Sequence, residues 1–144
     1  MKRFAIPLVL AAGAALSLIA VLAFAGAFDR APSVSPEELR VLRESAEAPV
    51  VIDVRSAEEY AAGHIPGALH IPYTEVAARI SEVDAPHGVA LYCMVGPRAR
   101  KGEAALLAAG YRAVLHVEGG YSAWREAGLP VERGESDLPV EGEE

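Results

Sequence analysis

The hydrophobic pattern of the chain begins with one long apolar segment. Residues 4–28 carry no formal charge, and Lys2 and Arg3 precede them. A basic start followed by an apolar run is typical of an export signal, and small residues near the end of the run suit cleavage. The run is also long enough to span a bilayer as an uncleaved anchor. We therefore predict that residues 1–27 are a signal peptide or an N-terminal membrane anchor, with the remaining chain extracytoplasmic.

After this segment, short apolar runs alternate with amphipathic stretches. Four of the runs have the composition of buried parallel strands and are bounded by turn residues: 50–54, 68–71, 89–92 and 113–117. The stretches between them predict helices, and a last short helix follows the glycine pair at 119–120. Strands that alternate with helices indicate a parallel sheet covered on both faces, so we predict the α/β class.

Local signals place the ends of the helices. Ser35 and Ser56 each have a glutamate three positions later, which is the pattern of a capping box. Thr74 is in position to cap a third helix, and a fourth is predicted over 98–109, ending at Gly110. The apolar faces are expected at Val76, Ile80 and Val83 in the third helix and at Ala99, Gly102, Leu106 and Ala109 in the fourth.

The charge balance limits the classes of partner. The net charge is −7, which argues against nucleic acid or an anionic membrane surface, since phosphate binding draws on clustered Lys and Arg. Between Glu132 and Glu144 the charged side chains are acidic apart from Arg133. We predict that residues 132–144 form an acidic, disordered tail.

Cys93 is the only cysteine in the chain. Cysteines in an oxidising compartment usually come in pairs, so a single one indicates a free reactive thiol. A predicted strand runs directly into Cys93, and the loop after it leads into a helix. Loop amides and the helix N-terminus can direct N–H groups at the sulfur and favour the thiolate, the form that attacks. Gly96 permits the backbone to curl round the sulfur, and Arg98 adds a positive charge.

The surroundings of Cys93 narrow the chemistry. No histidine lies within the loop that could act as a general base. A thiolate formed by the field of the loop suits uptake of a sulfane sulfur, or attack on a phosphate, better than a Cys-His hydrolase. The loop between Cys93 and Arg98 is one residue shorter than in phosphatases of this general type, which favours sulfur over a phosphoryl group.

The chain resembles the rhodanese family in three sets of motifs that occur in the family's order. They are Asp53-Val54-Arg55 with Glu59-Tyr60, Gly63-His64-Ile65-Pro66-Gly67-Ala68 and Ile71-Pro72; Tyr92-Cys93-x-x-Gly96-x-Arg98; and Gly119-Gly120-x-x-Ala123-Trp124 with Gly128-Leu129-Pro130. The resemblance covers residues 33–131, which we predict to be a rhodanese domain. The predicted export signal is similar to that of small periplasmic phage-shock rhodaneses.

The resemblance implies a five-stranded parallel sheet flanked by helices and a thiosulfate sulfurtransferase of the rhodanese type. Cys93 would take a sulfane sulfur from a donor such as thiosulfate, become a persulfide, and pass the sulfur to a thiophilic acceptor. Arg98 is implied as the second catalytic residue, acting on the donor's anionic group or steadying the loop. The residues implied to hold the persulfide through the loop backbone are Met94, Val95, Gly96 and Ala99, and those implied as supports are Asp53 and Arg55. His64, the Gly119-Gly120 turn and Trp124 are expected to be structural.

Two features depart from the family's pattern. Pro97 has no N–H to offer the sulfur, and Met94 and Val95 are apolar where many thiosulfate-using members carry polar or basic residues. An apolar loop favours a less charged donor or a protein thiol. The alternative function is a rhodanese-fold sulfur carrier or protein-binding module with little turnover. We expect a monomer whose partner is a small sulfur-containing anion or a protein thiol, with no metal and no cofactor.

Overall fold

The computed structural model describes residues 30–134, and within them a five-stranded parallel sheet forms the centre of the fold. The strand order is β1-β5-β4-β2-β3, and each neighbouring pair is parallel. This confirms the predicted α/β class and the five-stranded sheet. The strands are β1 (Ser33–Val34), β2 (Val50–Asp53), β3 (Leu69–His70), β4 (Val89–Tyr92) and β5 (Val114–Val117).

β1 is the strand that the hydrophobic pattern did not predict. It has two residues and pairs only with β5, through Ser33 opposite His116 and Val34 opposite Val117. Such a short edge strand presents too few alternating positions to be recognised by its period. Its register is determined by β5, which lies far away in the sequence.

The helices of the described region are α2 (Pro36–Leu42), α3 (Ala57–Ala62), α4 (Val76–Arg79), α5 (Pro97–Ala108) and α6 (Gly120–Glu126), with a 3₁₀ helix, η1 (Ile80–Glu82), after α4. Both predicted capping boxes are present. The Ser35 hydroxyl accepts the N–H of Glu38, and the Ser56 hydroxyl accepts that of Glu59. Gly110 follows the C-cap of α5 with φ of 89°, as predicted for a glycine that ends a helix.

Two local predictions are wrong. Thr74 does not cap α4, because the Pro72 carbonyl accepts the N–H groups of Glu75 and Val76 and a hydrogen-bonded turn begins the helix instead. Ala109 does not face the sheet: α5 ends at Ala108, and Ala109 is exposed. Both errors arise where a helix end depends on backbone bonds that side-chain periodicity does not report.

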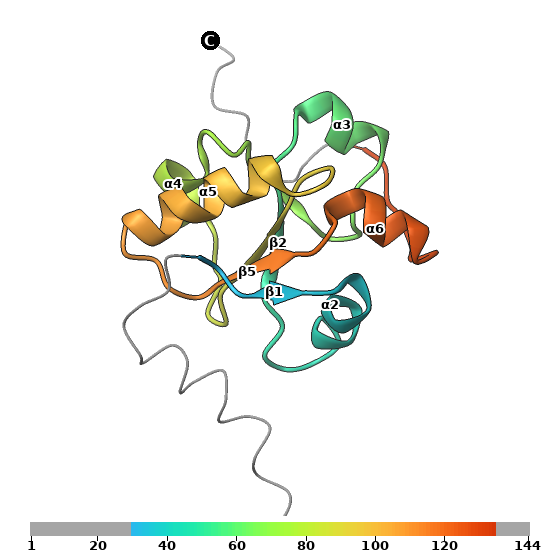
Figure 1. Ribbon diagram of the computed structural model, residues 1–144, viewed down its shortest axis with the longest axis horizontal. Coiled ribbons are helices and arrows are strands. Elements are labelled where there is room, and N and C mark those ends of the chain that lie inside the picture. The colour runs from blue at the N-terminus through green and yellow to red at the C-terminus, as the bar shows by residue number, and fades with distance from the viewer. Residues whose placement is uncertain (1–29, 135–144) are drawn as a thin grey trace, which may run out of the picture.

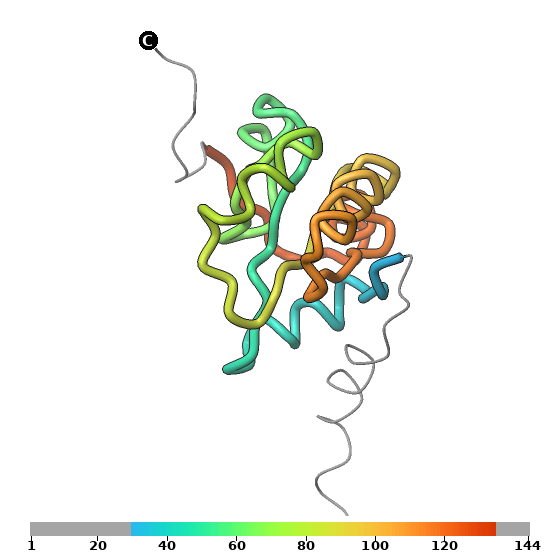
Figure 2. The backbone as a smooth tube through the Cα atoms, turned by 90° about the vertical axis from the view of Figure 1, so that its left-hand side faces the viewer, coloured from blue at the N-terminus to red at the C-terminus, as the bar shows by residue number. Residues whose placement is uncertain are grey.

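The sheet is covered on both faces, and each face has its own hydrophobic core (Figure 1). Alternate residues of β4 divide between the cores, with Val89 and Leu91 toward α4 and α5 and with Ala90 and Tyr92 toward α2 and α6. Figure 2 shows α5 running along the side of the sheet. Cys93 continues this alternation and belongs to the core beneath α5.

The domain extends beyond the boundary predicted for it. Glu132 forms an isolated antiparallel bridge with His64, and its carboxylate accepts the N–H of Gly67 at 2.9 Å. Gly134 donates its N–H to the carbonyl of Ala61. Residues 132–134 of the predicted disordered tail are therefore ordered against the α3 region, and the rest of that tail lies outside the described residues.

The predicted signal or anchor, residues 1–27, also lies outside the described residues. Between residues 30 and 134, none of the helices combines the length and the apolar character that crossing a membrane requires.

Candidate active site

Cys93 lies where β4 ends and the loop to α5 begins. Its sulfur accepts the N–H of Gly96 at 3.1 Å, and the residue is 1% exposed. Gly96 is the N-cap of α5 and has φ of 136° and ψ of −41°, a conformation that side chains disfavour. Pro97 occupies the first helical position, where a missing N–H costs nothing to the helix. The loop thus curls round the sulfur at Gly96, as the sequence predicted.

The other residues implied to hold the persulfide, Met94, Val95 and Ala99, form no hydrogen bond to the Cys93 sulfur among the described residues. Within the described region, Gly96 supplies the one backbone N–H recorded as donating to the Cys93 sulfur. Met94 is half-buried, Val95 is 60% exposed, and Ala99 is buried in the core beneath α5. The structure therefore brings Gly96 to the sulfur and directs Val95 away from the protein interior.

Arg98 is anchored by Glu59 of α3. Its two terminal nitrogens donate to the two carboxylate oxygens at 2.6 and 2.8 Å. The hydrogen bonds from Arg98 lower the pKa of Glu59 to about 2, against an opposing effect of burial. Glu59 in turn raises the pKa of Arg98, and a hydrogen bond and charge interaction with the Cys93 sulfur add to this. The guanidinium therefore links the first turn of α5 to α3, and its charge acts on the Cys93 sulfur.

Asp53 and Arg55 form a buried ion pair at the end of β2. Arg55 is 1% exposed and donates to Asp53 at 2.6 Å and to the Gly63 carbonyl at 2.7 Å. Its guanidinium carbon lies 4.2 Å from the centre of the Tyr121 ring. Burial lowers the pKa of Arg55, but the hydrogen bonds to Asp53 and the charge of Asp53 oppose this effect. The net shift of the pKa is upward. The pair connects β2, the turn at Gly63 and α6 behind the cysteine loop.

Gly120 supports the loop in a way that the sequence reasoning missed. It was expected to be a structural turn residue, and its φ of 57° agrees with that. Its absent side chain also matters, since a Cβ there would overlap the Cys93 carbonyl oxygen and lie 2.8 Å from that of Met94. This close approach lets the N–H groups of Tyr121 and Ser122 donate to those same carbonyls at 2.8 and 3.0 Å. The glycine pair at 119–120 indicated a turn, but the sequence could not show that this turn contacts the Cys93 and Met94 carbonyls.

Two cavities adjoin the loop and share Met94, Tyr121 and Arg125. Their volumes are about 270 and 310 Å³. The further lining residues are Ser122 and Glu126 in the first, and Arg55, Glu59, Ala62, Gly63, Val131 and Arg133 in the second. Cys93 lines neither cavity and is almost fully buried.

A cysteine at a strand end, cradled by a glycine N–H and flanked by an arginine, can carry a sulfur atom as a nucleophile. A family model of the rhodanese-like domain matches residues 35–127. The chain belongs to this family. The match includes Asp53, Arg55, Cys93, Arg98 and Gly120.

Relatives of this rhodanese-like domain carry sulfurtransferase names. A sulfurtransferase of Allochromatium vinosum is 38% identical over 82 residues, covering 57% of this chain and 77% of the relative. The thiosulfate sulfurtransferase GlpE of Pseudomonas entomophila is 37% identical over 92 residues, covering 64% of this chain and 83% of the relative.

Other matches are to parts of larger proteins. The HTH-type transcriptional regulator Rv0324 of Mycobacterium tuberculosis is 39% identical over 104 residues, and the match covers 71% of this chain but only 45% of the regulator. A crystal structure of a thiosulfate sulfurtransferase from Pseudomonas aeruginosa superposes with a TM-score of 0.66 at 31% identity, covering 74% of this chain and 20% of that one. The rhodanese-like domain thus occurs both alone and within longer chains.

A buried acid–histidine pair lies beside the loop of this rhodanese-like domain. His116 of β5 and Glu103 of α5 are 5% and 1% exposed, and Nδ1 of His116 lies 2.6 Å from Oε1 of Glu103. Arg100 donates to the same carboxylate at 3.1 Å. A Cβ built at Gly96 would lie 3.6 Å from Nε2 of His116. Sequence reasoning missed this pair, because nothing in the spacing of 103 and 116 shows that the two side chains meet.

Proposed function

We propose that this protein is a sulfurtransferase that moves a sulfane sulfur from a donor such as thiosulfate to a thiophilic acceptor through a persulfide on Cys93. The observation that carries the proposal is the Cys93 sulfur at the end of β4, accepting the Gly96 N–H at 3.1 Å, with Arg98 in the first turn of the helix that follows. The names of the Allochromatium and Pseudomonas relatives support it.

The cycle has two displacements at sulfur. In the first, the Cys93 thiolate attacks the outer sulfur of thiosulfate, the S–S bond of the donor breaks, and sulfite leaves with the bonding electron pair. In the second, the acceptor attacks the outer sulfur of the persulfide, and the Cys93 thiolate leaves. With cyanide as acceptor the product is thiocyanate. Both steps resemble thiol–disulfide exchange, because a nucleophile attacks one sulfur of an S–S bond and a stable anion leaves: sulfite in the first step and the Cys93 thiolate in the second.

The neighbouring residues have supporting roles in this proposal. Gly96 donates a hydrogen bond to the sulfur, and charge-assisted bonds of this kind stabilise an anion more than neutral ones do. Arg98 places a positive charge beside the sulfur while Glu59 holds the guanidinium in place. Asp53 and Arg55 hold the end of β2 against Tyr121 of α6.

A sulfur carrier or protein-binding module is the second candidate. It is favoured by the exposure of Val95, 60% open to solvent at the tip of the loop, and by the burial of Cys93. An exposed apolar side chain beside the reactive residue suits a protein partner. The two candidates differ in turnover, since a carrier loads one sulfur and releases it only to its partner.

The compartment belongs to the proposal as well. The charge-free run at 4–28 after Lys2 and Arg3 supports an extracytoplasmic protein, exported or anchored. Cell fractionation followed by N-terminal sequencing distinguishes cleavage from anchoring, and recovery of the intact protein in the cytosol would contradict both.

The decisive experiment is a thiosulfate:cyanide assay combined with mass spectrometry of the intact protein. We expect wild type to gain the mass of one sulfur atom from thiosulfate, to lose it to cyanide, and to produce thiocyanate over many cycles. Cys93→Ser should neither load nor turn over, because a hydroxyl is a poor nucleophile without a strong base. Loading without repeated turnover would favour the carrier, and no loading from any sulfane donor would rule out both candidates.

A further inference from the structure

The cavity residues Met94, Tyr121, Arg125, Val131 and Arg133, here called the mouth, come from three separate segments. Met94 belongs to the cysteine loop, Tyr121 and Arg125 to α6, and the last two to the segment after it. The backbone N–H of Tyr121 donates a hydrogen bond to the Cys93 carbonyl, so the mouth adjoins the reactive residue.

The charges lining the two cavities are unequally paired. The charge of Arg55 is neutralised by its ion pair with Asp53. The charge of Glu59 is neutralised by its ion pair with Arg98. Arg125 and Arg133 form no ion pair with a carboxylate of the described residues.

Their guanidiniums are held in other ways. Arg133 donates to the Ala62 carbonyl at 3.2 Å, and Arg125 lies over the Tyr121 ring at 5.9 Å. Glu126 is the one carboxylate of the two cavities without an ion-pair partner in the described region. The mouth therefore has a positive excess in a chain whose net charge is −7.

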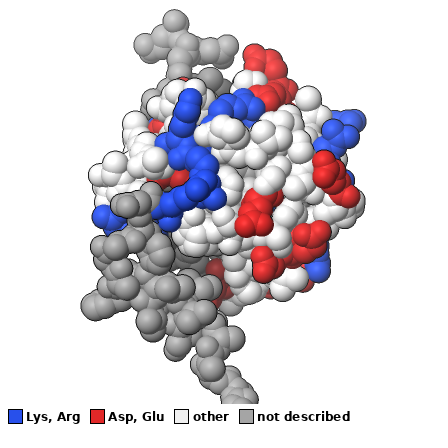
Figure 3. Space-filling model, in the orientation of Figure 1, with Lys and Arg blue, Asp and Glu red and all other residues white. Residues whose placement is uncertain are grey.

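The positive excess of the mouth rests on Arg125 and Arg133, which line the cavities. On the face shown in Figure 3, basic side chains gather over α5, whose first turn follows the cysteine loop, and acidic side chains lie over α2, α3 and α6. Charge of one sign in a cleft raises the local concentration of ligands of the opposite sign. The mouth thus favours an anion over a neutral or cationic ligand.

The volume and the lining residues of the mouth fit a ligand larger than a small inorganic anion. A volume of about 310 Å³ is at the lower end of the range for organic ligands, roughly 300–1,000 Å³, and corresponds to about ten water molecules. Thiosulfate would fill only part of it. Met94 and Val131, the latter 43% exposed, offer apolar contact between the cysteine loop and the arginines. This combination suits a short carbon chain that ends in a carboxylate.

We propose that the mouth is an acceptor site selective for a carboxylate-bearing thiol, with Arg125 and Arg133 as the residues that determine this specificity. The proposal rests on the proposed function. The acceptor's thiolate attacks the outer sulfur of the Cys93 persulfide, the S–S bond breaks, and Cys93 leaves as a thiolate. The product is the persulfide of the acceptor, and the acceptor's proton has gone to solvent. The loop side chains alone favour a less charged ligand, and it is the arginines of other segments that reverse this preference.

The first test uses three thiols of similar length as acceptors for the persulfide of the full-length protein: 3-mercaptopropionate, 2-mercaptoethanol and cysteamine. The second-order rate for Arg125→Gln and for Arg133→Gln is divided by the wild-type rate with the same thiol, so that intrinsic thiol reactivity cancels. Because each acceptor attacks as its thiolate, the reacting species carry net charges of −2, −1 and 0 in that order. We expect each substitution to slow 3-mercaptopropionate most, about threefold relative to cysteamine, with 2-mercaptoethanol between them. The effects should shrink as salt is added.

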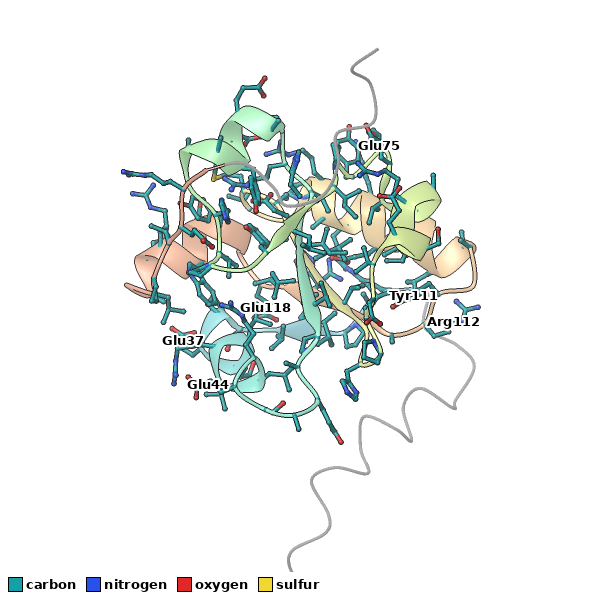
Figure 4. The ribbon with its side chains drawn as sticks, turned by 180° about the vertical axis from the view of Figure 1, so that it is seen from behind. Glu37, Glu44, Glu75, Tyr111, Arg112 and Glu118 are labelled. Atoms are coloured by element: carbon teal, nitrogen blue, oxygen red, sulfur yellow. The ribbon has the colours of Figure 1, made fainter. Side chains whose placement is uncertain are left out.

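Arg112→Gln is the matched control. Arg112 is an exposed arginine in the turn between α5 and β5, at the opposite end of the strands from Cys93 (Figure 4). It should change the three rates equally or not at all. An equal change with all three thiols in the mouth variants, or no change, would overturn the proposal.

A second measurement separates this proposal from the sulfurtransferase proposal. Alkylation of the Cys93 thiol by iodoacetate, an anion, and by iodoacetamide, its neutral counterpart, requires no sulfur transfer; each displaces iodide. We expect the iodoacetate-to-iodoacetamide rate ratio to fall about threefold in each mouth variant and to stay at the wild-type value in Arg112→Gln. If wild type loads no sulfur but this ratio falls, the function fails while the anion-selective mouth stands. An unchanged ratio overturns the mouth itself.

Discussion

Gly120 shows how a single absent side chain determines the position of the reactive loop. The residue lies where α6 begins, and its backbone touches the carbonyls of Cys93 and Met94. The two N–H groups that follow it donate to those carbonyls. The loop is therefore held from behind by α6 as well as by its own turn at Gly96.

We predict that Gly120→Ala destabilises the domain by about 3 kcal/mol, because the new Cβ meets backbone oxygens and the φ of 57° is unfavourable for alanine. It should also slow Cys93 alkylation by iodoacetamide under native conditions. Urea unfolding and alkylation kinetics measure the two effects.

Gly128→Ala is the control, since Gly128 has φ of 70° but open space around its Cβ position. It should cost about 1 kcal/mol and leave alkylation unchanged. Equal effects of the two substitutions would show that the close approach of Gly120 to the loop has no influence on Cys93.

At the scale of elements, ion pairs join helices to the segments that carry the site. Arg98 in the first turn of α5 is tied to Glu59 in the first turn of α3. Because the pKa of Glu59 is depressed from 4.5 to about 2, this carboxylate stabilises the fold fully above about pH 4.5. Its contribution is lost as the pH falls toward 2, where the folded protein takes up the proton.

We predict that Glu59→Gln lowers the free energy of unfolding by about 1 kcal/mol at pH 6, a value typical of a well-formed but partly exposed ion pair. The difference from wild type should diminish between pH 4.5 and 2 and vanish at the acid end. Urea unfolding across this range tests it, with Glu37→Gln on α2 as a control that should show no such trend. A difference that is constant with pH would contradict the role of the ionised carboxylate.

Glu103 joins α5 to β5 and to the N-terminal segment. It accepts from His116 and from Arg100, and Arg100 also donates to the Ala31 carbonyl and the Ser33 hydroxyl. Removal of this buried carboxylate takes the acceptor from the buried His116 ring and the counter-charge from Arg100, which keeps its bonds to Ala31 and Ser33.

We predict that Glu103→Ala lowers the free energy of unfolding by about 3 kcal/mol. Glu37→Ala, at an exposed glutamate of α2 (Figure 4), should change it by about 0.5 kcal/mol or less. Denaturant titration of both variants gives the comparison. A small effect at Glu103 would mean that water replaces the carboxylate, and the pair would then have no role in joining α5 to the sheet.

At the scale of the whole molecule, the order β1-β5-β4-β2-β3 brings four remote segments to one edge of the sheet. The carboxyl ends of parallel strands lie on the same side, which is where ligands bind in open α/β sheets. Cys93 follows β4, Asp53 ends β2, and α6 follows β5. The segment after α6 then returns to α3 through Glu132 and His64, which places Arg133 beside the mouth.

Features that depend on residues close together along the chain could be predicted from the sequence. Both capping boxes, the strands β2, β4 and β5, the turn at Gly96 and the position of Cys93 at a strand end rest on residues within a few positions of one another. Hydrogen bonds such as those from Glu38 to Ser35 and from Glu59 to Ser56 span three residues, so spacing is enough to predict them. Membership of the rhodanese-like family was equally readable, because its motifs are local.

Contacts between residues far apart in the sequence became visible only in the folded chain. The Arg98–Glu59 pair, the His116–Glu103 pair, the contact of Gly120 with the Cys93 carbonyl and the arginines of the mouth all join segments far apart in the sequence. Such contacts follow from how helices pack on the sheet, and residue spacing carries no information about that packing. For this reason Cys93 could be identified from the sequence, while the charge that surrounds its entrance required the fold.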